Sequence, residues 1–413
     1  MAALDQSAKL SAPGPEPLAR ALFDPPRLGR IARCWIAIAA VAYLVDLLRQ
    51  TRVGLTDGVD RPFGDDFINY WSGAFLALHG RAAEVYDFLA FHAFESSVTG
   101  PNLDLYHYSY PPVLLLLTAP LALVPYVPAL GVWLVGTWYG FYRALKLTGG
   151  EGVFLLSLAT PALFVNAFGG QNGALTAALM GGGLVLVDRR PIVAGILFGL
   201  LAYKPHLALM LPVALIAGRR WLTVSAAGLT VLLLVTASAL AFGPDRWLQY
   251  EHNLAVLRAI ILEHGVGLGH RMVSVFVFAR QLGASISFAY GLQAAFAIPA
   301  VFFVARSWLR DDPAYIRNAM VVVGTCLLTP YLQDYDLVIG AFVVVWLQMG
   351  EANSRIPAHW IRAAMAMILL LPIAAAALAK HVGFPPGPLV FVLVFALLIA
   401  LAADHRRDAA CGY

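Results

Sequence analysis

The chain has 413 residues, of which 60% are hydrophobic and 13% are charged, and its mean hydropathy is +0.74. A soluble domain is far less apolar, so this composition indicates a polytopic membrane protein. The net charge of +4 is small, and the arginines lie in short clusters between apolar runs, a pattern that marks membrane topology and excludes a nucleic-acid surface. The cysteines lack the spacing of a disulfide framework or a zinc site.

The apolar runs predict an all-α fold with about 11–13 transmembrane helices. Residues 1–33 are expected to form a disordered cytoplasmic tail, because their charged stretch is too long for a signal peptide. Residues 34–403 form the transmembrane domain, and residues 404–413 form a second cytoplasmic tail. The expected spans are, in chain order, Cys34–Leu48, Pro111–Tyr142 (one kinked span or two), Val153–Phe168, Ala174–Val187, Ile192–Ala202, Leu207–Ala217, Trp221–Phe242, Ile286–Val304, Ala319–Leu328, Leu337–Met349, Ala363–Ala379 and Leu389–Ala402.

Clusters of Lys and Arg predict which loops face the cytoplasm. All clusters face one side only if the region Pro111–Tyr142 crosses the membrane an odd number of times; two short helices there would turn some basic pairs outward. We favour the single-sided arrangement, which places the protein in the inner (plasma) membrane with its other turns on the extracytoplasmic face. The clusters are Arg20, Arg27, Arg30 and Arg33 before the first span, Arg143 with Lys146, Arg189 with Arg190, Arg219 with Arg220, Arg306 with Arg310 and Arg317, Arg355 with Arg362, and Arg406 with Arg407.

The extracytoplasmic loop, residues 50–110, is expected to contain helices that lie along the membrane interface. Aromatic residues recur at helical spacing from 67 to 75 with polar residues between them, and a second such helix is expected between 85 and 94. Trp and Tyr favour the headgroup layer, so Tyr108 and Tyr110 are expected to anchor the interface. Helices that face solvent are the alternative.

A carboxylate pair, Asp65 and Asp66, opens the first of these helices. A carboxylate at that position often caps free backbone NH groups, and capping is the structural alternative. The functional interpretation is a general base at the membrane surface that takes a proton from an attacking hydroxyl.

Cationic residues in later turns are candidates for binding an anionic leaving group. Lys204 lies at a helix break beside a proline and is the leading candidate, although a lysine there often only marks a membrane boundary. His206 and Arg271 are further candidates for a phosphate ligand, because an imidazole can donate to a phosphate oxygen and a guanidinium can bind phosphate in a bidentate way.

Amides and carboxylates in the same turns are candidates for binding sugar or acceptor hydroxyls. Their structural alternatives are helix capping for the amides and solvation at the surface for the carboxylates. The candidates are Gln171, Asn172, Asp334 and Asp336.

Several short motifs follow one another in a characteristic order. The first group is Asp66-Phe67-Ile68-Asn69-Tyr70-Trp71, Leu78-His79-Gly80, Val85-Tyr86-Asp87, and Tyr110-Pro111-Pro112 leading to Thr118-Ala119-Pro120-Leu121. The second group is Gly170-Gln171-Asn172-Gly173, Tyr203-Lys204-Pro205 followed by Arg219-Arg220-Trp221, and Thr329-Pro330 followed by Tyr335-Asp336. This series resembles the family 87 glycosyltransferases over most of the chain, the termini excepted.

The resemblance implies a GT-C-like architecture with the active site in the first extracytoplasmic loop. It implies a polyprenyl phosphate sugar donor, usually carrying mannose, and a glycolipid or glycan acceptor, with membrane lipids around them. It also implies that Asp66 is the general base, because Tyr70 stands four positions after it, with Asp65 as the second choice and Tyr70 near the sugar. The turn after Thr329 lacks the histidine or tryptophan often found near it, so the resemblance does not supply a phosphate ligand there.

No metal or cofactor is expected, since the sequence has neither a clear Asp-X-Asp motif nor a Gly-rich phosphate loop. A lipid monophosphate can be neutralised by one or two cationic side chains, whereas a nucleotide sugar usually needs a divalent cation. A transporter is the alternative function, because broken helices with isolated charges also occur in carriers. Most charges here lie at helix ends and there is no internal repeat, which favours the enzyme.

Overall fold

The computed structural model describes residues 25–265 and 269–411, and within these ranges the chain is helical without a β-sheet. Six helices are long and apolar enough to cross a membrane: Pro26–Arg49, Trp221–Phe242, Ile286–Leu309, Asp334–Ala352, Ala358–His381 and Gly387–Arg407. Six shorter apolar helices are Phe67–Leu78, Val113–Leu123, Gly173–Leu186, Pro191–Tyr203, Pro205–Ala217 and Ala314–Leu328. The all-α membrane fold is confirmed. The expected total of about 11–13 transmembrane helices requires that some of the shorter helices also cross the membrane, and this number stays a prediction.

The helices have the following bounds in chain order. They are α2 (Pro25–Arg49), α3 (Phe67–Leu78), η1 (Glu84–Tyr86), α4 (Phe88–Thr99), α5 (Val113–Thr118), η2 (Ala119–Leu123), α6 (Tyr126–Lys146), α7 (Val153–Ala159), α8 (Pro161–Phe168), α9 (Gly173–Leu186), α10 (Pro191–Leu200), η3 (Leu201–Tyr203), α11 (Pro205–Ala208), α12 (Met210–Ala217), α13 (Trp221–Phe242), α14 (Asp245–Leu257), η4 (Arg258–Glu263), η5 (Gly269–Arg271), α15 (Val275–Gln281), α16 (Ile286–Leu309), α17 (Ala314–Leu328), η6 (Asp334–Ile339), α18 (Gly340–Ala352), α19 (Ala358–His381) and α20 (Gly387–Cys411).

Two ends of the chain differ from the expected boundaries. Helix α2 begins at Pro25, before the expected start at Cys34, because the segment between them contains helix-compatible Leu, Ile, Ala and Arg. The rest of the expected tail, residues 1–24, lies outside the described residues. Helix α20 continues to Cys411, so the expected tail at 404–413 is helical through that residue.

Ion pairs gather three turns at one end of the molecule. Arg220 lies 2.8 Å from Asp188 and 3.1 Å from Asp311, and Arg317 pairs with the same two aspartates. We call these four residues the basal cluster. It joins the α9–α10, α12–α13 and α16–α17 turns, so three of the basic loops predicted to face one side lie together here.

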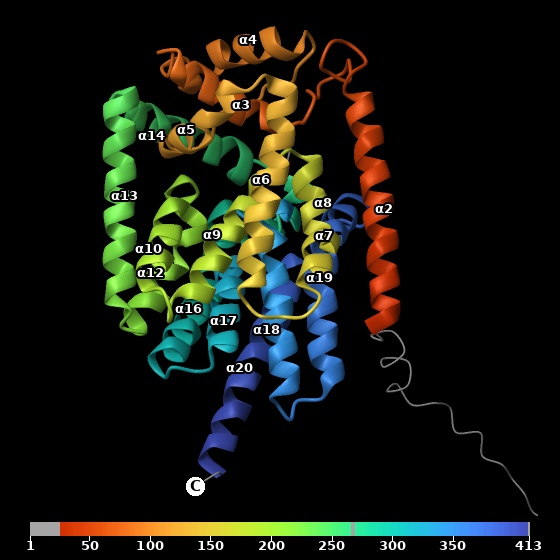
Figure 1. The fold of residues 1–413 in the computed structure, drawn as a ribbon, viewed down its shortest axis with the longest axis vertical. Coiled ribbons are helices and arrows are strands. Elements are labelled where there is room, and N and C mark those ends of the chain that lie inside the picture. The colour runs from red at the N-terminus through yellow and green to blue at the C-terminus, as the bar shows by residue number, and fades with distance from the viewer. Residues whose placement is uncertain (1–24, 266–268, 412–413) are drawn as a thin grey trace, which may run out of the picture.

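The region Pro111–Tyr142 contains a short helix followed by a long one. In this region α5 and η2 pack against α3, at the end of the molecule opposite to the basal cluster. Only α6, with 21 residues, runs from that end toward the basal end of the molecule (Figure 1). A single long helix gives the odd number of crossings that the single-sided charge pattern requires.

The inner helices are shorter than the outer ones. Helices α9 and α17 have 14 and 15 residues and α13 has 22, which at a rise of about 1.5 Å per residue gives lengths of about 21, 23 and 33 Å. Asp188 follows α9 and pairs with Arg220, which precedes α13. The C-terminal end of α9 and the N-terminal end of α13 therefore lie at the same height, beside the basal cluster. The other end of α9 therefore stops about 10 Å short of the end of α13, and α9 is shorter than a hydrocarbon layer of about 30 Å.

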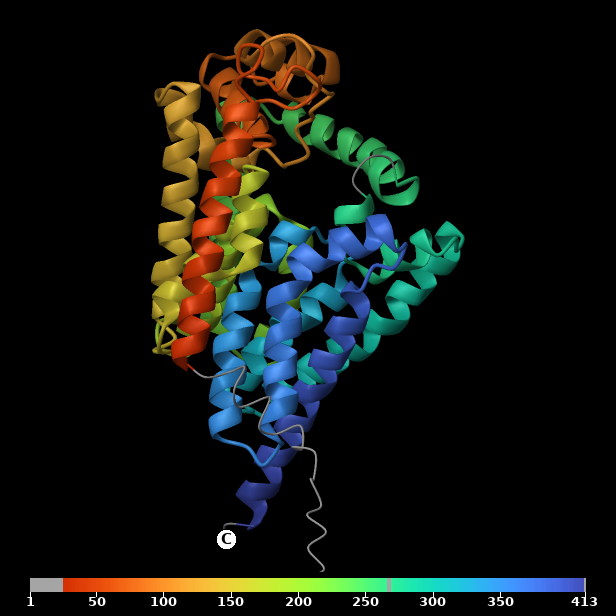
Figure 2. The same cartoon turned by 90° about the vertical axis from the view of Figure 1, so that its right-hand side faces the viewer.

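Helices α3 and α4 cover the end opposite to the basal cluster (Figures 1 and 2). Helix α4 keeps an exposed face with Leu89 on it, as expected for a helix in the interface. Helix α3 instead has buried residues on almost every side, because α5, η2 and α4 pack around it. It is the inner layer of this cover, and its first turn reaches the recessed end of α9.

Candidate active site

Segments that are distant in the sequence meet below α3. They are the turn before α3, the turn between α8 and α9, the break between η3 and α11, the short helix η5, and the turn between α17 and η6. Every candidate residue named from the sequence lies in or beside these segments. The side chains nevertheless differ in how they are engaged.

Asp66 occupies the N-cap position of α3, yet its side chain accepts no capping hydrogen bond from any described backbone NH group. Gln171 Nε2 donates to Asp66 Oδ2 instead. Burial, and then the charge of Asp65, raises the pKa of Asp66 to about 7, while Arg271 and Arg61 act in the opposite direction. Because the side chain is partly exposed, this carboxyl group changes its protonation near neutral pH at an accessible place.

Asp65 has a different environment from its neighbour. Arg61 Nη2 lies 2.8 Å from Asp65 Oδ2, and the Tyr106 hydroxyl donates to Asp65 Oδ1 over 2.6 Å. Arg61 also pairs with Asp46 on α2 at 3.2 Å. These contacts tie the loop to the first helix, so the geometry gives Asp65 a structural role and leaves Asp66 as the candidate base.

A hydrogen-bond network continues from Asp66 into the interior. The Tyr70 hydroxyl donates to Gln171 Oε1 over 3.0 Å, and Asn172 Nδ2 donates to the hydroxyls of Tyr70 at 3.0 Å and Tyr110 at 2.8 Å. The expectation that Tyr108 and Tyr110 anchor the interface is wrong: Tyr110 belongs to this network, and Tyr108 is buried beneath the cover. Their side chains face inward because the segment before α5 runs under α3 and α4.

Lys204 ends the network in a closed environment. Its Nζ donates to Asn172 Oδ1 over 3.0 Å and to Asp336 Oδ1 over 2.5 Å, and it lies 4.6 Å from the centroid of the Tyr335 ring. The side chains of Lys204 and Asp336 are 2% and 1% exposed. The backbone NH of Gln333 donates to the other oxygen of Asp336 over 3.2 Å. Two of the three ammonium N–H donors are therefore held by the protein, and the side chain is closed to solvent.

Arg271 is the more accessible cation. Its Nε and Nη2 donate to the two carboxylate oxygens of Asp334 over 3.1 and 3.2 Å. Its side chain is 21% exposed, against 4% for Asp334, and it influences the pKa of Asp66. A guanidinium held by one edge keeps further donors for an anion.

Two glycines allow the turn that carries Gln171 and Asn172 to fit between its neighbours. A Cβ on Gly170 would lie 2.1 Å from the carbonyl oxygen of Gly64, and one on Gly173 would lie 2.0 Å from that of Tyr335. No side chain fits at such distances. The two glycines of the Gly-Gln-Asn-Gly motif are therefore required by space, because Gln171 and Asn172 lie in the narrow gap between the Asp66 turn and the Tyr335 turn.

His206 lies at the edge of this assembly. Its ring meets that of Tyr331 edge to face at 5.5 Å, and its Nε2 is buried without a hydrogen-bond partner among the residues that the structure describes. In the same described ranges, no group of three His, Cys, Asp or Glu side chains is arranged to hold a metal ion.

Sequence reasoning missed Glu95, a second carboxyl group near Asp66. Glu95 is fully buried on α4. The side-chain amide of Asn69 has all its hydrogen bonds satisfied when its Nδ2 donates to Glu95 Oε1 over 3.3 Å and to the carbonyl oxygen of His107 over 3.1 Å. Burial, with a smaller effect of Asp66, raises the pKa of Glu95 well above its usual value. The signal was present in the sequence, because Glu95 stands four residues after the buried Phe91 on one helix face.

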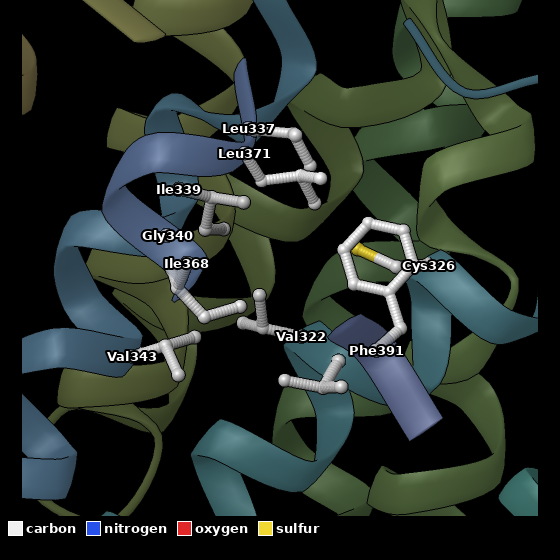
Figure 3. A pocket seen from close by; sticks show the side chains of 10 residues that line it. Val322, Cys326, Leu337, Ile339, Gly340, Val343, Ile368, Leu371 and Phe391 are labelled. Carbon is white, nitrogen blue, oxygen red and sulfur yellow. The ribbon is translucent and has the colours of Figure 1, made fainter. Parts of the chain in front are cut away.

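A small apolar cavity lies directly beyond η6 (Figure 3). Its walls are hydrocarbon apart from one thiol, so it offers no polar group for a sugar or phosphate, and we interpret it as imperfect packing among the inner helices. Its lining residues are Val322, Val323, Cys326, Leu337, Ile339, Gly340, Val343, Ile368, Leu371 and Phe391.

Together these features define a polytopic membrane protein with a recessed polar site, in which a carboxyl group of nearly neutral pKa lies close to an accessible arginine. The family model of Glycosyltransferase family 87 matches residues 108–330, more than half of the chain, and the chain belongs to this family. It is therefore a membrane glycosyltransferase, as the motif order predicted. No match was found among curated proteins or among solved structures. The matched range includes Gln171, Lys204 and Arg271 and begins after Asp66.

Proposed function

We propose that the protein transfers mannose from a polyprenyl phosphate donor to a hydroxyl group of a glycolipid or glycan on the extracytoplasmic face of the plasma membrane. The observation that carries this proposal is the placement of Asp66, whose partly exposed carboxyl group accepts a hydrogen bond from Gln171. Burial raises its pKa to about 7, which suits a general base that works near neutral pH. Its position at the recessed end of α9 suits substrates whose reacting groups lie near the lipid headgroups.

The reaction is a single displacement with inversion at the sugar. Asp66 takes the proton of the acceptor hydroxyl while the hydroxyl oxygen forms a bond to the anomeric carbon. The bond between that carbon and the phosphate oxygen breaks, and its electron pair leaves with the polyprenyl phosphate. The products are the glycosylated acceptor, the lipid phosphate and a proton that Asp66 later releases to water.

Arg271 is the residue that we assign to the departing phosphate. Expelling an anionic group requires donors aimed at the oxygen that gains charge, and Arg271 is partly exposed and close to Asp66. Lys204, the leading candidate from the sequence, is buried and paired with Asp336. We therefore propose that Lys204 positions Asn172, and that His206, at the edge of the site, is a secondary phosphate donor.

The remaining polar groups are proposed to hold sugar or acceptor hydroxyls. Gln171 contacts both Asp66 and Tyr70, so a hydroxyl bound there would lie beside the base. Asp334 and Asp336 act by holding the two cations, and the Asp334 carboxylate can also accept from a hydroxyl. The extracytoplasmic placement of all these groups rests on the basic loops that gather at the opposite end.

Transfer of label tests this function. Purified protein in liposomes would receive polyprenyl phosphate mannose with a radiolabelled sugar, together with a membrane lipid extract. The proposal predicts label in a new lipid or glycan product, and an inverted anomeric configuration in that product. Transfer from a nucleotide sugar, with none from any polyprenyl phosphate sugar, would contradict it. Liposomes that contain the parent protein but no acceptor are the control.

A further inference from the structure

Helix α14 presents a polar face to the interior of the molecule. Arg246, Gln249 and Asn253 recur at helical spacing on that face, while Leu248 and Leu254 on other faces are exposed. Gly243, with φ +91°, turns the chain at the end of α13, so α14 lies across the same end of the molecule as α3 and α5 (Figures 1 and 2).

Contacts connect this face to the active-site network. Asn253 Nδ2 donates to the carbonyl oxygen of Tyr86 over 2.7 Å, and the Tyr86 hydroxyl donates to the carbonyl oxygen of Tyr110 over 3.0 Å. Trp247 Nε1 donates to Ser238 Oγ over 3.2 Å, which fixes α14 against α13. The polar face of α14 is thus held in a defined position beside Tyr86, which contacts Tyr110 of the active-site network.

Arg246 and Gln249 carry polar atoms that nothing in the described chain satisfies. The Nε and Nη1 of Arg246 and the Oε1 of Gln249 are buried and have no hydrogen-bond partner among the described residues. Leaving such groups unpaired is costly. The cations at the active site differ in this respect, since Arg61, Lys204 and Arg271 each pair with an aspartate.

We propose that Arg246 and Gln249 form a second anion-binding site, which takes the phosphate ester of a lipid acceptor. The guanidinium would donate to phosphate oxygens, and the amide oxygen of Gln249 accepts, so it would bind a hydroxyl beside that phosphate. The inference rests on the proposed function, because it assigns one phosphate to each substrate: the donor phosphate to Arg271 and the acceptor phosphate to Arg246. The acceptor is accordingly an anionic lipid with a hydroxyl-bearing headgroup.

Lipid binding to the full-length protein, measured by native mass spectrometry, tests this site without any transfer reaction. The probes are phosphatidylglycerol, whose headgroup has a phosphate and hydroxyls, sugar-free polyprenyl monophosphate, and uncharged diacylglycerol. Losing hydrogen bonds to a charged group should weaken binding of phosphatidylglycerol to R246Q by about 10-fold or more and leave polyprenyl phosphate binding unchanged. R271Q should show the reverse, and diacylglycerol should bind the parent weakly.

The control variant is R258Q, since Arg258 is exposed on the adjoining π-helical turn and should bind both lipids as the parent does. R246K, which keeps the charge and loses the forked donors, should fall between the parent and R246Q. R246Q should also melt at or above the temperature of the parent, because it removes two buried guanidinium nitrogens that have no partner among the described residues; a merely structural role would lower that temperature.

Equal binding of phosphatidylglycerol to the parent and to R246Q would overturn the proposed site. An R258Q protein that loses as much phosphatidylglycerol binding as R246Q would also overturn it, because such a result indicates general attraction to surface charge. A loss of polyprenyl phosphate instead would assign Arg246 to the donor and also overturn it. If the lipid-binding pattern holds but no label moves from polyprenyl phosphate mannose, the proposed function fails and the anion site stands.

Discussion

The two ends of the molecule each carry a charged cluster, and the two clusters are built differently. In the basal cluster, Arg220 is 30% exposed and its partners Asp188 and Asp311 are 37% and 69% exposed, while Arg317 beside them is 4% exposed. At the active site, the pair formed by Lys204 and Asp336 is almost fully buried. Exposed pairs contribute little to stability, since water screens them, whereas a buried pair that loses one partner leaves an uncompensated charge. The basal cluster therefore aligns helix ends, while the site cluster fixes the geometry of a polar centre.

Breaking each cluster should give the largest difference between the two ends. We expect Lys204→Met to lower the free energy of unfolding by about 3–5 kcal/mol, because Asp336 is left buried and unpaired. Arg220→Met should cost less than about 1 kcal/mol. Denaturation of the purified protein in detergent measures both values. The double variant Lys204→Met with Asp336→Leu should recover most of the loss, and equal losses at the two ends would remove the distinction.

Activity should separate the arginines of the two ends next. Arg271→Gln is expected to lower the rate of sugar transfer about 10²- to 10³-fold, because the departing phosphate loses a donor. Arg317→Gln, in the basal cluster, should leave that rate unchanged. Single-turnover transfer of label compares the variants. A rate for Arg271→Gln equal to that of the parent would rule out the assigned phosphate contact.

A smaller effect is expected at Gln171, which donates to Asp66. A hydrogen bond to the carboxylate favours its charged form, so Gln171→Leu should raise the pKa of Asp66 by about one unit. The acid limb of the pH–rate profile should then move to higher pH. Asn172→Leu, which has no direct contact with Asp66, is the matched control, and a shift of equal size in that variant would count against the assignment.

The smallest effect is expected at Glu95. Burial raises the pKa of Glu95 well above the usual value, which favours the protonated form, and an amide of the same shape should replace it. We expect Glu95→Gln to change the free energy of unfolding by less than about 1 kcal/mol, as measured by denaturation. Asp336→Asn, which breaks a buried ion pair, should cost more. A large loss in Glu95→Gln would mean that Glu95 is charged.

The sequence predicted the membrane fold, the family and the gathering of Asp66, Gln171 and Asn172, because polar turns between apolar helices and the positions of basic clusters are local features. It did not predict which charges pair. Lys204, at the break between η3 and α11, meets Asp336, in η6, only through the packing of separate helices. Such pairing depends on distances between separate helices, and these cannot be obtained from spacing along one chain.

The burial of Tyr108 and Glu95 was missed for a related reason. Aromatic residues in a membrane protein are most often assigned to the interface, and one carboxylate on a loop helix is most often assigned to solvent. Here α4 lies over α3 as a second layer, so residues expected to face lipid or water are enclosed. A double layer is a tertiary feature that periodicity in either helix does not reveal.

The pH dependence of sugar transfer in the parent, Asp66→Asn and Asp65→Asn proteins tests the central claim most directly. We expect the parent rate to rise with pH up to about 7 and then level off, because the base must be deprotonated. Asp65→Asn should keep this limb but shift it to lower pH, since the charge of Asp65 helps to raise the pKa of Asp66. Asp66→Asn should lower the rate about 10²- to 10⁴-fold and lose the limb. Transfer by Asp66→Asn as fast as by the parent would contradict the assignment of Asp66 as the base.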